Sequence, residues 1–233
     1  MKKLSIYVFI IGCPLTALAS TLGWKGEAEL GFVATKGNTE TQSVNAKSDV
    51  NDERKNWRHN FHTEALNASA DGVRSAERYN VSGQSNYKFN DFDSAFVVGN
   101  LDDDRFSAYD YQVSIAAGYA RRLIDREGQT LDFEIGPGYR INKRDNGTST
   151  EESLVRLGAK YLLPLSKTSY FQQSLVSEIG KESTITKSIT SVKARINGSL
   201  AMKTSFTLKN NSYVPAGAKE TDTETALTLV YAF

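Results

Sequence analysis

The sequence predicts an all-β fold: a transmembrane, antiparallel, up-and-down β-barrel of about 12 strands, an even number as in bacterial outer-membrane barrels. The first observation is the closing stretch, residues 220–233, in which Leu227, Leu229, Tyr231 and Phe233 alternate with small or polar residues. Alternation with a period of two is typical of a strand with one apolar face. The second observation is that such segments recur along the chain between turn signals. The third is the aromatic carboxy-terminus, which suits the interfacial aromatic band of a membrane barrel.

The amino-terminus is typical of a secretory signal peptide. Two lysines near the start precede an apolar stretch, residues 4–18, which ends in a small-x-small cleavage site at Ala19. The apolar stretch is too short and too broken to favour a retained transmembrane helix. We therefore expect residues 1–19 to be a signal peptide and residues 20–233 to form the barrel.

An alternative for this region is a lipoprotein processing site at residues 10–13, with Cys13 as the lipidated residue, although Pro14 follows it directly. Cleavage after Ala19 would instead remove the single cysteine of the chain. The mature protein would then have neither disulfides nor cysteine-based metal sites.

The charge balance excludes one class of partner. The chain has 28 Lys and Arg against 27 Asp and Glu, a formal net charge of +1, which gives no reason to expect nucleic acid. The mean hydropathy is that of a soluble protein, but a membrane barrel escapes such averages because alternate residues face lipid. The prediction therefore depends on alternation, strand by strand.

The first part of the chain contains five predicted strands, separated by turns rich in Gly, Asn and Asp. They cover residues 24–35, 41–50, 57–68, a segment that ends at Phe89, and residues 94–101. The fifth is the least defined, because both of its faces are apolar. It leads into a predicted acidic loop at Asp102–Arg105.

The second part contains the remaining predicted strands. The sixth places Tyr109 and Tyr111 on its outward face. The seventh, around residues 131–140, contains Gly136-Pro137-Gly138, which predicts a β-bulge because proline cannot donate to the ladder. The outward apolar residues of the last five lie within 155–161, 171–179, 190–196, 206–214 and 220–233.

Aromatic residues are expected to mark the membrane interfaces, and one set falls at the strand ends on the side of the two termini: Trp24, Trp57, Phe89, Phe96, Tyr119, Phe133, Tyr161, Phe171, Phe206 and Phe233. The outward faces carry no charged residue in mid-strand, where a basic side chain would cost about 2–4 kcal/mol at the bilayer midplane. Connections on the terminal side are predicted to be short, and those on the other side longer, notably 102–108, 142–152 and 215–223.

A soluble β-sandwich or lipocalin-like barrel also alternates and is the main alternative fold. Its apolar face would point inward, into a core of packed aliphatic side chains. In this sequence many residues of the apolar faces are small, and charged residues crowd the opposite faces. This pattern favours the membrane barrel.

Short motifs are spread over nearly the whole mature chain: Gly31-Phe32 through Lys36-Gly37-Asn38-Thr39, Asp104-Arg105-Phe106, Gly136-Pro137-Gly138-Tyr139, Tyr161-Leu162-Leu163-Pro164-Leu165, and Asp222-Thr223 to Phe233. Together they resemble a family of salt-induced outer membrane proteins of Gram-negative bacteria, of the YdiY type. The resemblance implies an outer-membrane location and a role in the salt or osmotic response. It brings no established biochemical activity and hence no catalytic residues.

The polar faces carry charges that we expect to line the lumen: Glu27, Glu29, Lys47, Arg58, Glu64, Arg78, Asp132, Glu134, Arg156, Lys160, Lys193 and Arg195. One interpretation is a narrow aqueous pore for ions or small solutes, in which charged rings set selectivity. The other is a non-conducting structural or receptor-type barrel, in which neighbouring charges pair and fill the lumen, as Asp132 and Glu134 would with Arg156 and Lys160. A barrel of about 12 strands lies between filled and open barrels, so both stay open.

Two weaker alternatives concern chemistry. A barrel hydrolase needs a serine and a histidine in hydrogen-bond reach; the two histidines, His59 and His62, fall on opposite faces without a nucleophile motif. The acidic run Asp102, Asp103 and Asp104 offers carboxylate oxygens of the kind that Ca²⁺ takes, although such a loop is more often solvated. We therefore expect neither an enzyme nor a cofactor.

The expected partners follow from the expected location in the outer membrane. They are its lipids and lipopolysaccharide, and the outer-membrane assembly machinery. The terminal Tyr231 and Phe233 resemble the signal that this machinery reads. The barrel is expected to be a monomer.

Overall fold

The chain folds into a closed antiparallel β-barrel in this computed structural model, which describes residues 24–35, 41–71, 73–105, 107, 109–144, 147–214 and 219–233. The predicted signal peptide, with Cys13, lies outside the described residues. No helix among the residues described is long and apolar enough to cross a membrane.

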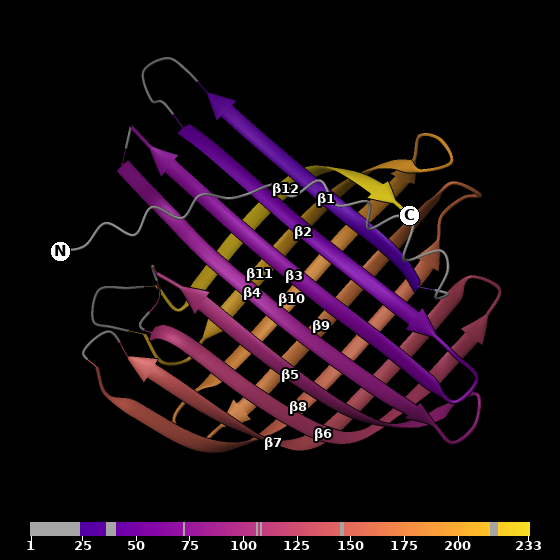
Figure 1. Ribbon diagram of the computed structural model, residues 1–233, viewed down its shortest axis with the longest axis horizontal. Coiled ribbons are helices and arrows are strands. Elements are labelled where there is room, and N and C mark those ends of the chain that lie inside the picture. The colour runs from indigo at the N-terminus through magenta and orange to yellow at the C-terminus, as the bar shows by residue number, and fades with distance from the viewer. Residues whose placement is uncertain are drawn as a thin grey trace.

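The barrel is built from strands that each pair with the next along the chain, and β1 pairs with β12 to close it (Figure 1). In chain order they are β1 (Trp24–Thr35), β2 (Thr41–Glu53), β3 (Trp57–Ala70), β4 (Val73–Lys88), β5 (Asp93–Asp104), β6 (Tyr109–Arg126), β7 (Gln129–Arg144), β8 (Ser149–Pro164), β9 (Ser169–Gly180), β10 (Thr184–Arg195), β11 (Leu200–Asn211) and β12 (Thr221–Ala232). The predicted all-β antiparallel barrel is confirmed.

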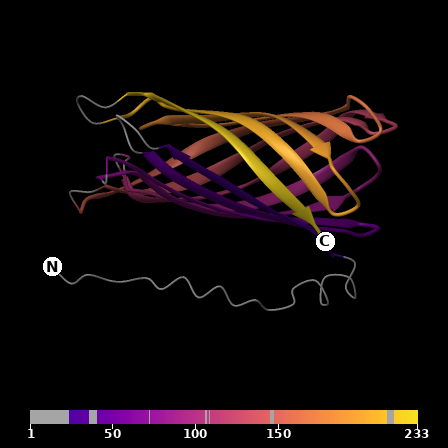
Figure 2. The same cartoon turned by 90° about the horizontal axis from the view of Figure 1, so that it is seen from above.

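The barrel has two distinct ends. The proximal end carries Trp24, Phe233 and the connections at 54–56, 89–92, 127–128, 165–168 and 196–199. The distal end carries the connections at 36–40, 71–72, 105–108, 145–148, 181–183 and 212–220. Figure 2 shows the strands strongly tilted between the two ends, as barrel closure requires.

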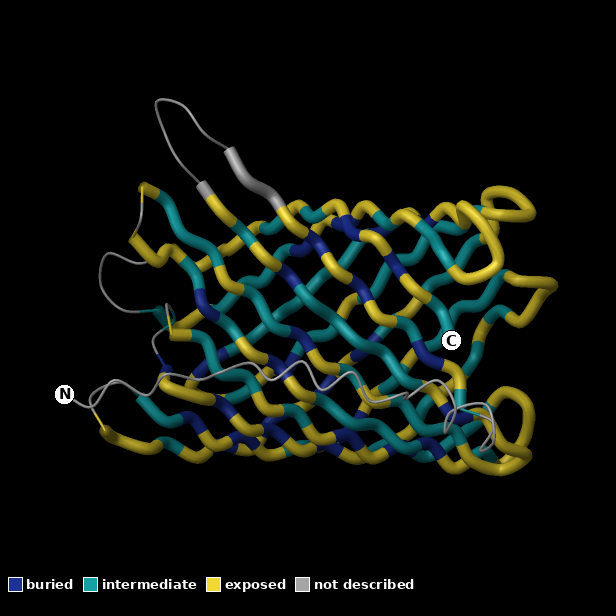
Figure 3. The backbone as a smooth tube through the Cα atoms, turned by 45° about the horizontal axis from the view of Figure 1, so that its top comes forward, coloured by how far each residue is buried: buried dark blue, intermediate teal, exposed yellow. Residues whose placement is uncertain are grey.

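The barrel is apolar outside and polar inside. Outward side chains such as Leu30, Phe32, Ile115, Ile135 and Leu227 are each more than half exposed. Most of the buried residues among those described are polar or charged, and exposed and buried residues alternate along the strands (Figure 3). A soluble barrel or sandwich has the reverse arrangement, so that alternative is wrong. The exterior is the kind that faces lipid.

One predicted girdle residue, Phe96, points inward and is 3% exposed, packed with Val98 and Ala116. Alternation could not decide the orientation of β5, because both of its faces are apolar. The neighbouring Asn100 bonds to Asn80 inside the lumen, and this fixes Phe96 on the same side. Phe206 also departs from the predicted girdle, because it lies in the middle of β11.

Tyr109, predicted to face outward, is instead buried, with 1% exposure. The register of β6 against β7 shifts between Tyr109 and Tyr111. Such an irregularity turns the residue beyond it to the other face of the sheet. Tyr109 thereby lies against Tyr213, with 6.1 Å between ring centroids.

The predicted bulge at Gly136-Pro137-Gly138 is absent from the ladder, because Gly136, Pro137 and Gly138 keep an unbroken register with β8. The glycines serve a different purpose. A Cβ at Gly118 would meet the backbone of Ile135 and Gly136, and one at Gly136 would meet the backbone of Ala117. The backbones of β6 and β7 approach too closely here for any side chain on these two residues.

Two of the three distal connections that were predicted to be long are shorter than predicted. β5 continues through Asp104 and β6 begins at Tyr109; β7 and β8 similarly leave 145–148 as their connection. The polar residues assigned to loops continue the alternation, and every second one turns its side chain into the lumen. Asp102, for example, bonds to Lys209 at 2.8 Å.

The contact between β6 and β7 generates a prediction for stability. Gly118→Ala should lower the free energy of unfolding by about 1–3 kcal/mol, the usual cost of overpacking, because backbone atoms cannot move aside as a side chain can. Gly99→Ala on β5, where a Cβ meets nothing within 4 Å, is the matched control and should unfold like the wild type. Urea titration in detergent micelles measures both, and equal stability of the two variants would contradict the close approach.

Candidate functional site

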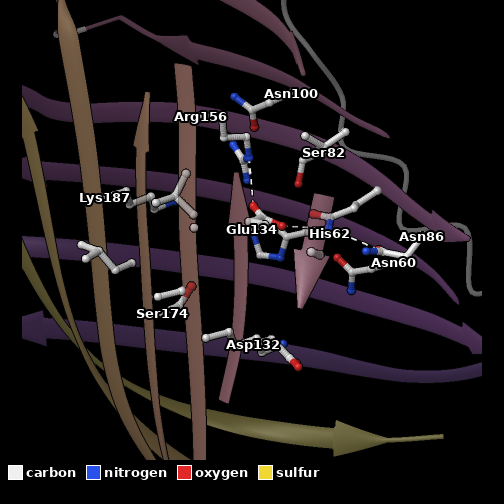
Figure 4. A pocket seen from close by; sticks show the side chains of 18 of the residues that line it. Asn60, His62, Ser82, Asn86, Asn100, Asp132, Glu134, Arg156, Ser174 and Lys187 are labelled. Atoms are coloured by element: carbon white, nitrogen blue, oxygen red, sulfur yellow. Dashed lines mark hydrogen bonds and ion pairs between the residues drawn. The ribbon is translucent and has the colours of Figure 1, made fainter. Parts of the chain in front are cut away.

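The lumen is the candidate functional site. It contains a cavity of about 460 Å³ that extends from proximal residues such as Asp93 and Arg122 to distal residues such as Asp102 and Lys209. Figure 4 shows its lining, with Asn60, Asn86, Ser174 and other polar side chains pointing into it. Period-two alternation places these residues on the inward face of each strand.

The structure places all of the predicted lumen charges on inward faces. Those that line the main cavity are Lys47, Arg58, Glu64, Asp132, Glu134, Arg156 and Lys160. Glu27, Lys193 and Arg195 line a smaller cavity of about 90 Å³ between β10, β12 and β1. The remaining two are Glu29, which pairs with Lys203 at 2.6 Å, and Arg78, which pairs with Glu64 and Glu224.

Glu64 forms ion pairs with basic side chains from three strands. Its carboxylate lies 3.2 Å from Lys47 on β2, 3.0 Å from Arg78 on β4 and 3.4 Å from Lys187 on β10. The side chain of Glu64 is 2% exposed, so these partners compensate a desolvated charge. Since β10 lies across the lumen from β3 in the strand order, the contact with Lys187 joins opposite walls.

A second ion pair also joins opposite walls. Lys209 on β11 lies 2.8 Å from Asp102 and 3.9 Å from Asp104 on β5. These two carboxylates face the lumen, whereas the alternation of β5 turns Asp103 to the other face. The three residues of the weak metal candidate, Asp102, Asp103 and Asp104, therefore do not converge on one point in this structure.

The third group of charges surrounds Arg140. This side chain is 1% exposed; its guanidinium lies 2.7 Å from Glu152 and 3.4 Å from Glu178 and donates to the Ser183 carbonyl oxygen at 2.7 Å. Arg156 joins this group through Glu178, at 3.0 Å. Glu178 lies on the inward face, as its position in the predicted ninth strand required, whereas Glu152 was not among the predicted lumen charges because residues 142–152 were predicted to form a loop.

The predicted pairs of β7 with β8 form only in part. Arg156 Nε donates to Glu134 at 3.0 Å, as Figure 4 shows. Asp132 instead accepts from Arg122 of β6 at 2.7 Å. Lys160, although it is the Cα partner of Asp132, extends into the cavity as an exposed side chain.

These contacts divide the lumen along its axis. Several ion pairs lie in the distal halves of their strands, and we call the following pairs the distal ion-pair layer: Glu64 with Lys187, Asp102 with Lys209, Arg78 with Glu224, and Arg140 and Arg156 with Glu178. The proximal part of the cavity, with Arg58, Lys160 and the amide side chains of Asn60 and Asn86, is the proximal vestibule.

The two histidines lie on opposite faces, as their positions on β3 require. His62 faces the lumen, with Nδ1 2.9 Å from Asp49 Oδ1 and Nε2 3.8 Å from Glu64. His59 faces outward, stacked on Trp57, and its Nδ1 lies 2.8 Å from Ser85 Oγ. Sequence reasoning missed this serine, because pairing of β3 with β4 brings it there.

The contact of His59 with Ser85 does not amount to a catalytic triad. Asp52 is the cross-strand neighbour of His59, but its Oδ2 accepts a hydrogen bond of 2.6 Å from Arg54 Nε. A nucleophile also needs its base oriented by a third group. The geometry therefore offers a satisfied polar pair on the outer surface.

The Arg140 cluster generates a prediction for stability. Arg140→Met should lower the free energy of unfolding by about 3–5 kcal/mol, because Glu152 would stay buried without its cation. Lys88→Met is the matched control. Lys88 pairs at 2.7 Å with Glu53, whose side chain is 54% exposed, so its loss should cost less than about 1 kcal/mol. Urea titration in detergent micelles measures both, and equal losses would contradict the burial of the cluster.

Comparison with known structures supports the fold. The structure is similar to the COG4313 outer membrane channel from Pseudomonas putida F1, with a TM-score of 0.52, 10% sequence identity, and coverage of 90% of this chain and 95% of that one. It is also similar to the NanC porin, with a TM-score of 0.50, 10% identity, and coverage of 88% and 98%. The fold is thus that of outer-membrane β-barrels.

Comparison of sequences gives the family. The chain is 29% identical over 210 residues to "Uncharacterized protein YdiY" of Escherichia coli (strain K12), which covers 90% of this chain and 83% of that protein. Residues 28–233 match the family described as "Protein of unknown function, DUF481". The resemblance to YdiY-type proteins is therefore confirmed, and the chain belongs to the DUF481 family.

Proposed function

We propose that the protein is an integral outer-membrane barrel that forms a narrow channel for ions or small solutes. The observation that carries the proposal is the cavity of about 460 Å³ inside the barrel, lined by charged, amide and hydroxyl side chains. A lumen with this lining holds water, and its charges act on permeating ions at close range. The likeness to an outer membrane channel and to a porin supports the same class of function at the level of the fold.

The proposed orientation puts the proximal end in the periplasm. Both Trp24 and Phe233 lie at this end, and single-chain barrels of the outer membrane begin and end on the periplasmic side with short turns. Export would use the predicted signal peptide at residues 1–19. The role in the salt or osmotic response rests on the family resemblance alone.

The distal ion-pair layer supports a second candidate, a non-conducting barrel. Glu64 with Lys187 and Asp102 with Lys209 connect opposite walls. Together with the Arg140 cluster, these pairs occupy the distal part of the lumen. The two candidates differ in whether ions pass this layer, so the layer is the part of the lumen to change in a test.

The channel proposal predicts small conductance steps for the purified, refolded protein in planar bilayers. Lys187→Ala should enlarge each step by about two-fold or more, because it removes the side chain that crosses the lumen to Glu64 and leaves the wall intact. Lys160→Ala is the control: it also removes one lysine from the cavity, but from the proximal vestibule, and should leave the step size nearly unchanged.

The outcomes separate the two candidates. If neither the wild type nor Lys187→Ala gives steps, the channel proposal fails and the non-conducting barrel stands. If Lys187→Ala and Lys160→Ala give the same step size, the distal ion-pair layer is not the constriction.

The terminal strand generates a prediction for assembly, in which Tyr231 and Phe233 form the signal for the assembly machinery. Phe233 also caps the closing strand: it exchanges backbone hydrogen bonds of 2.9 Å with Gly26, and its ring lies over that glycine. Deletion of Phe233 should reduce the folded barrel in outer membranes more than Lys160→Ala does, as measured by heat-modifiable migration on gels. Equal amounts of the two variants would contradict a signal at this residue.

A further inference from the structure

The seam between β1 and β12 is paired over part of its length. Its Cα partners run from Glu27 with Ala232 to Leu30 with Leu229. Each strand is paired much further with its other neighbour: β1 pairs with β2 from end to end, and β12 with β11 along nearly all of its length. At the proximal end the pairing continues through the backbone hydrogen bonds of Gly26 with Phe233. Toward the distal end, among the described residues, no Cα partners follow Leu30 and Leu229.

The views of the ribbon show the same feature. β1 and β12 meet beside the C-terminus at the proximal end and diverge toward the distal end (Figures 1 and 2). Phe32 and Leu227, which a continued register would bring opposite each other, are 65% and 55% exposed. These exposures match those of the paired Leu30 and Leu229, so they mark the lipid-facing surface beside the seam. The strands are still close at Gly31, where a Cβ would lie 3.2 Å from the Leu227 carbonyl oxygen, and the strand edges without Cα partners lie beyond it.

Strand edges of this kind are unstable within an apolar layer. Each backbone N–H or C=O group without a partner costs several kcal/mol in hydrocarbon, which is why spanning barrels are normally closed along every seam. The gap between the distal halves of β1 and β12, which we call the wedge, must therefore hold water or the polar groups of a ligand. The side chains behind the wedge indicate which ligand.

Behind the wedge, one carboxylate connects β12 to the strands beyond β1. Glu224 of β12 accepts 2.7 Å hydrogen bonds from Asn45 Nδ2 of β2 and from an Arg78 terminal nitrogen of β4. Lys47 of β2 lies 4.0 Å from the same carboxylate. Glu224 thus occupies a site in which an amide, a guanidinium and an ammonium converge on an anion.

This site has unused hydrogen-bonding capacity. Arg78 Nε, a donor, is buried without a hydrogen-bond partner among the described residues. A buried donor of a charged group without an acceptor is costly. A carboxylate has two oxygens, and both oxygens of Glu224 already accept hydrogen bonds. A phosphate group has more oxygens and can therefore also accept a hydrogen bond from Nε of the Arg78 guanidinium.

We propose that the distal half of the β1–β12 seam is a lateral opening that binds the headgroup of an anionic membrane lipid. The phosphate takes the place of the Glu224 carboxylate on Asn45, Lys47 and Arg78. The acyl chains lie outside, against Phe32 and Leu227. The proposal rests on the proposed membrane location but not on conduction.

The test uses the full-length protein in nanodiscs that contain equal amounts of phosphatidylglycerol and phosphatidylcholine, and counts the lipids retained by native mass spectrometry. The wild type should retain phosphatidylglycerol in preference. Arg78→Gln should reduce this retention about tenfold, the loss of one charge-assisted hydrogen bond. Glu224→Gln should increase it, because the competing anion is removed while the shape of the side chain is kept.

Lys209→Gln is the matched control. It also removes one cation from the distal ion-pair layer, but that cation pairs with Asp102 and Asp104 of β5 rather than with Glu224. Its lipid retention should equal that of the wild type. Equal retention of the two lipids by the wild type, or equal losses in Arg78→Gln and Lys209→Gln, would overturn the proposal. Displacement of phosphatidylglycerol by millimolar inorganic phosphate would assign the site to free anions and overturn the lipid ligand.

A second measurement on the wild type tests the opening itself. In amide hydrogen exchange, the amides of β12 that point toward β1 should exchange faster from Thr221 to Thr228 than from Leu229 to Tyr231. Uniform protection along β12 would show a seam paired throughout and would overturn the lateral opening. A protein that gives no conductance steps yet retains phosphatidylglycerol would remove the channel proposal and leave this one standing.

Discussion

The constraint on which the structure depends is the pairing of backbone polar groups around a closed ring of strands. A strand that crosses an apolar layer cannot leave its N–H and C=O groups free, so every strand needs two neighbours. Most neighbouring strands are joined by ten or more pairs of Cα partners, whereas β1 and β12 are joined by four such pairs. Closure is thus weakest where the two ends of the chain meet. The contact of Phe233 with Gly26 lies at the paired end of this seam.

With its apolar side chains turned outward, the barrel has little hydrophobic core to stabilise its interior. The buried cluster consists of Phe96, Val98 and Ala116. Ion pairs and hydrogen bonds across the lumen take over the role of a core. Such pairs contribute less net stability than apolar packing, because both partners must be desolvated. They also leave space that water can occupy, and this combination is what permits a cavity of about 460 Å³ inside the barrel.

Alternation alone predicted the strands, the closed barrel and the side of the sheet that most residues face. It failed where it carries no information: both faces of β5 are apolar, so Phe96 could not be oriented, and the irregularity at Tyr109 has no signature in the sequence. The partners of the lumen charges were harder still. Glu64 and Lys187 are 123 positions apart, and they meet because of the tilt and shear of the whole barrel, which no local pattern encodes.

The tilt and shear of the barrel also bring one side chain, Arg78, into contact with carboxylates of both the lumen and the seam. Arg78 donates to Glu64, at 3.0 Å, and to Glu224, at 2.7 Å. The first of these carboxylates also holds Lys187 across the lumen, while the second connects β12 to β2 and β4 behind the open part of the seam. Both contacts use the same terminal nitrogen of Arg78, so whatever displaces Glu224 changes the charge balance around Glu64 as well. A ligand at the proposed lateral opening would therefore act directly on the ion pair between Glu64 and Lys187, without any movement of the strands.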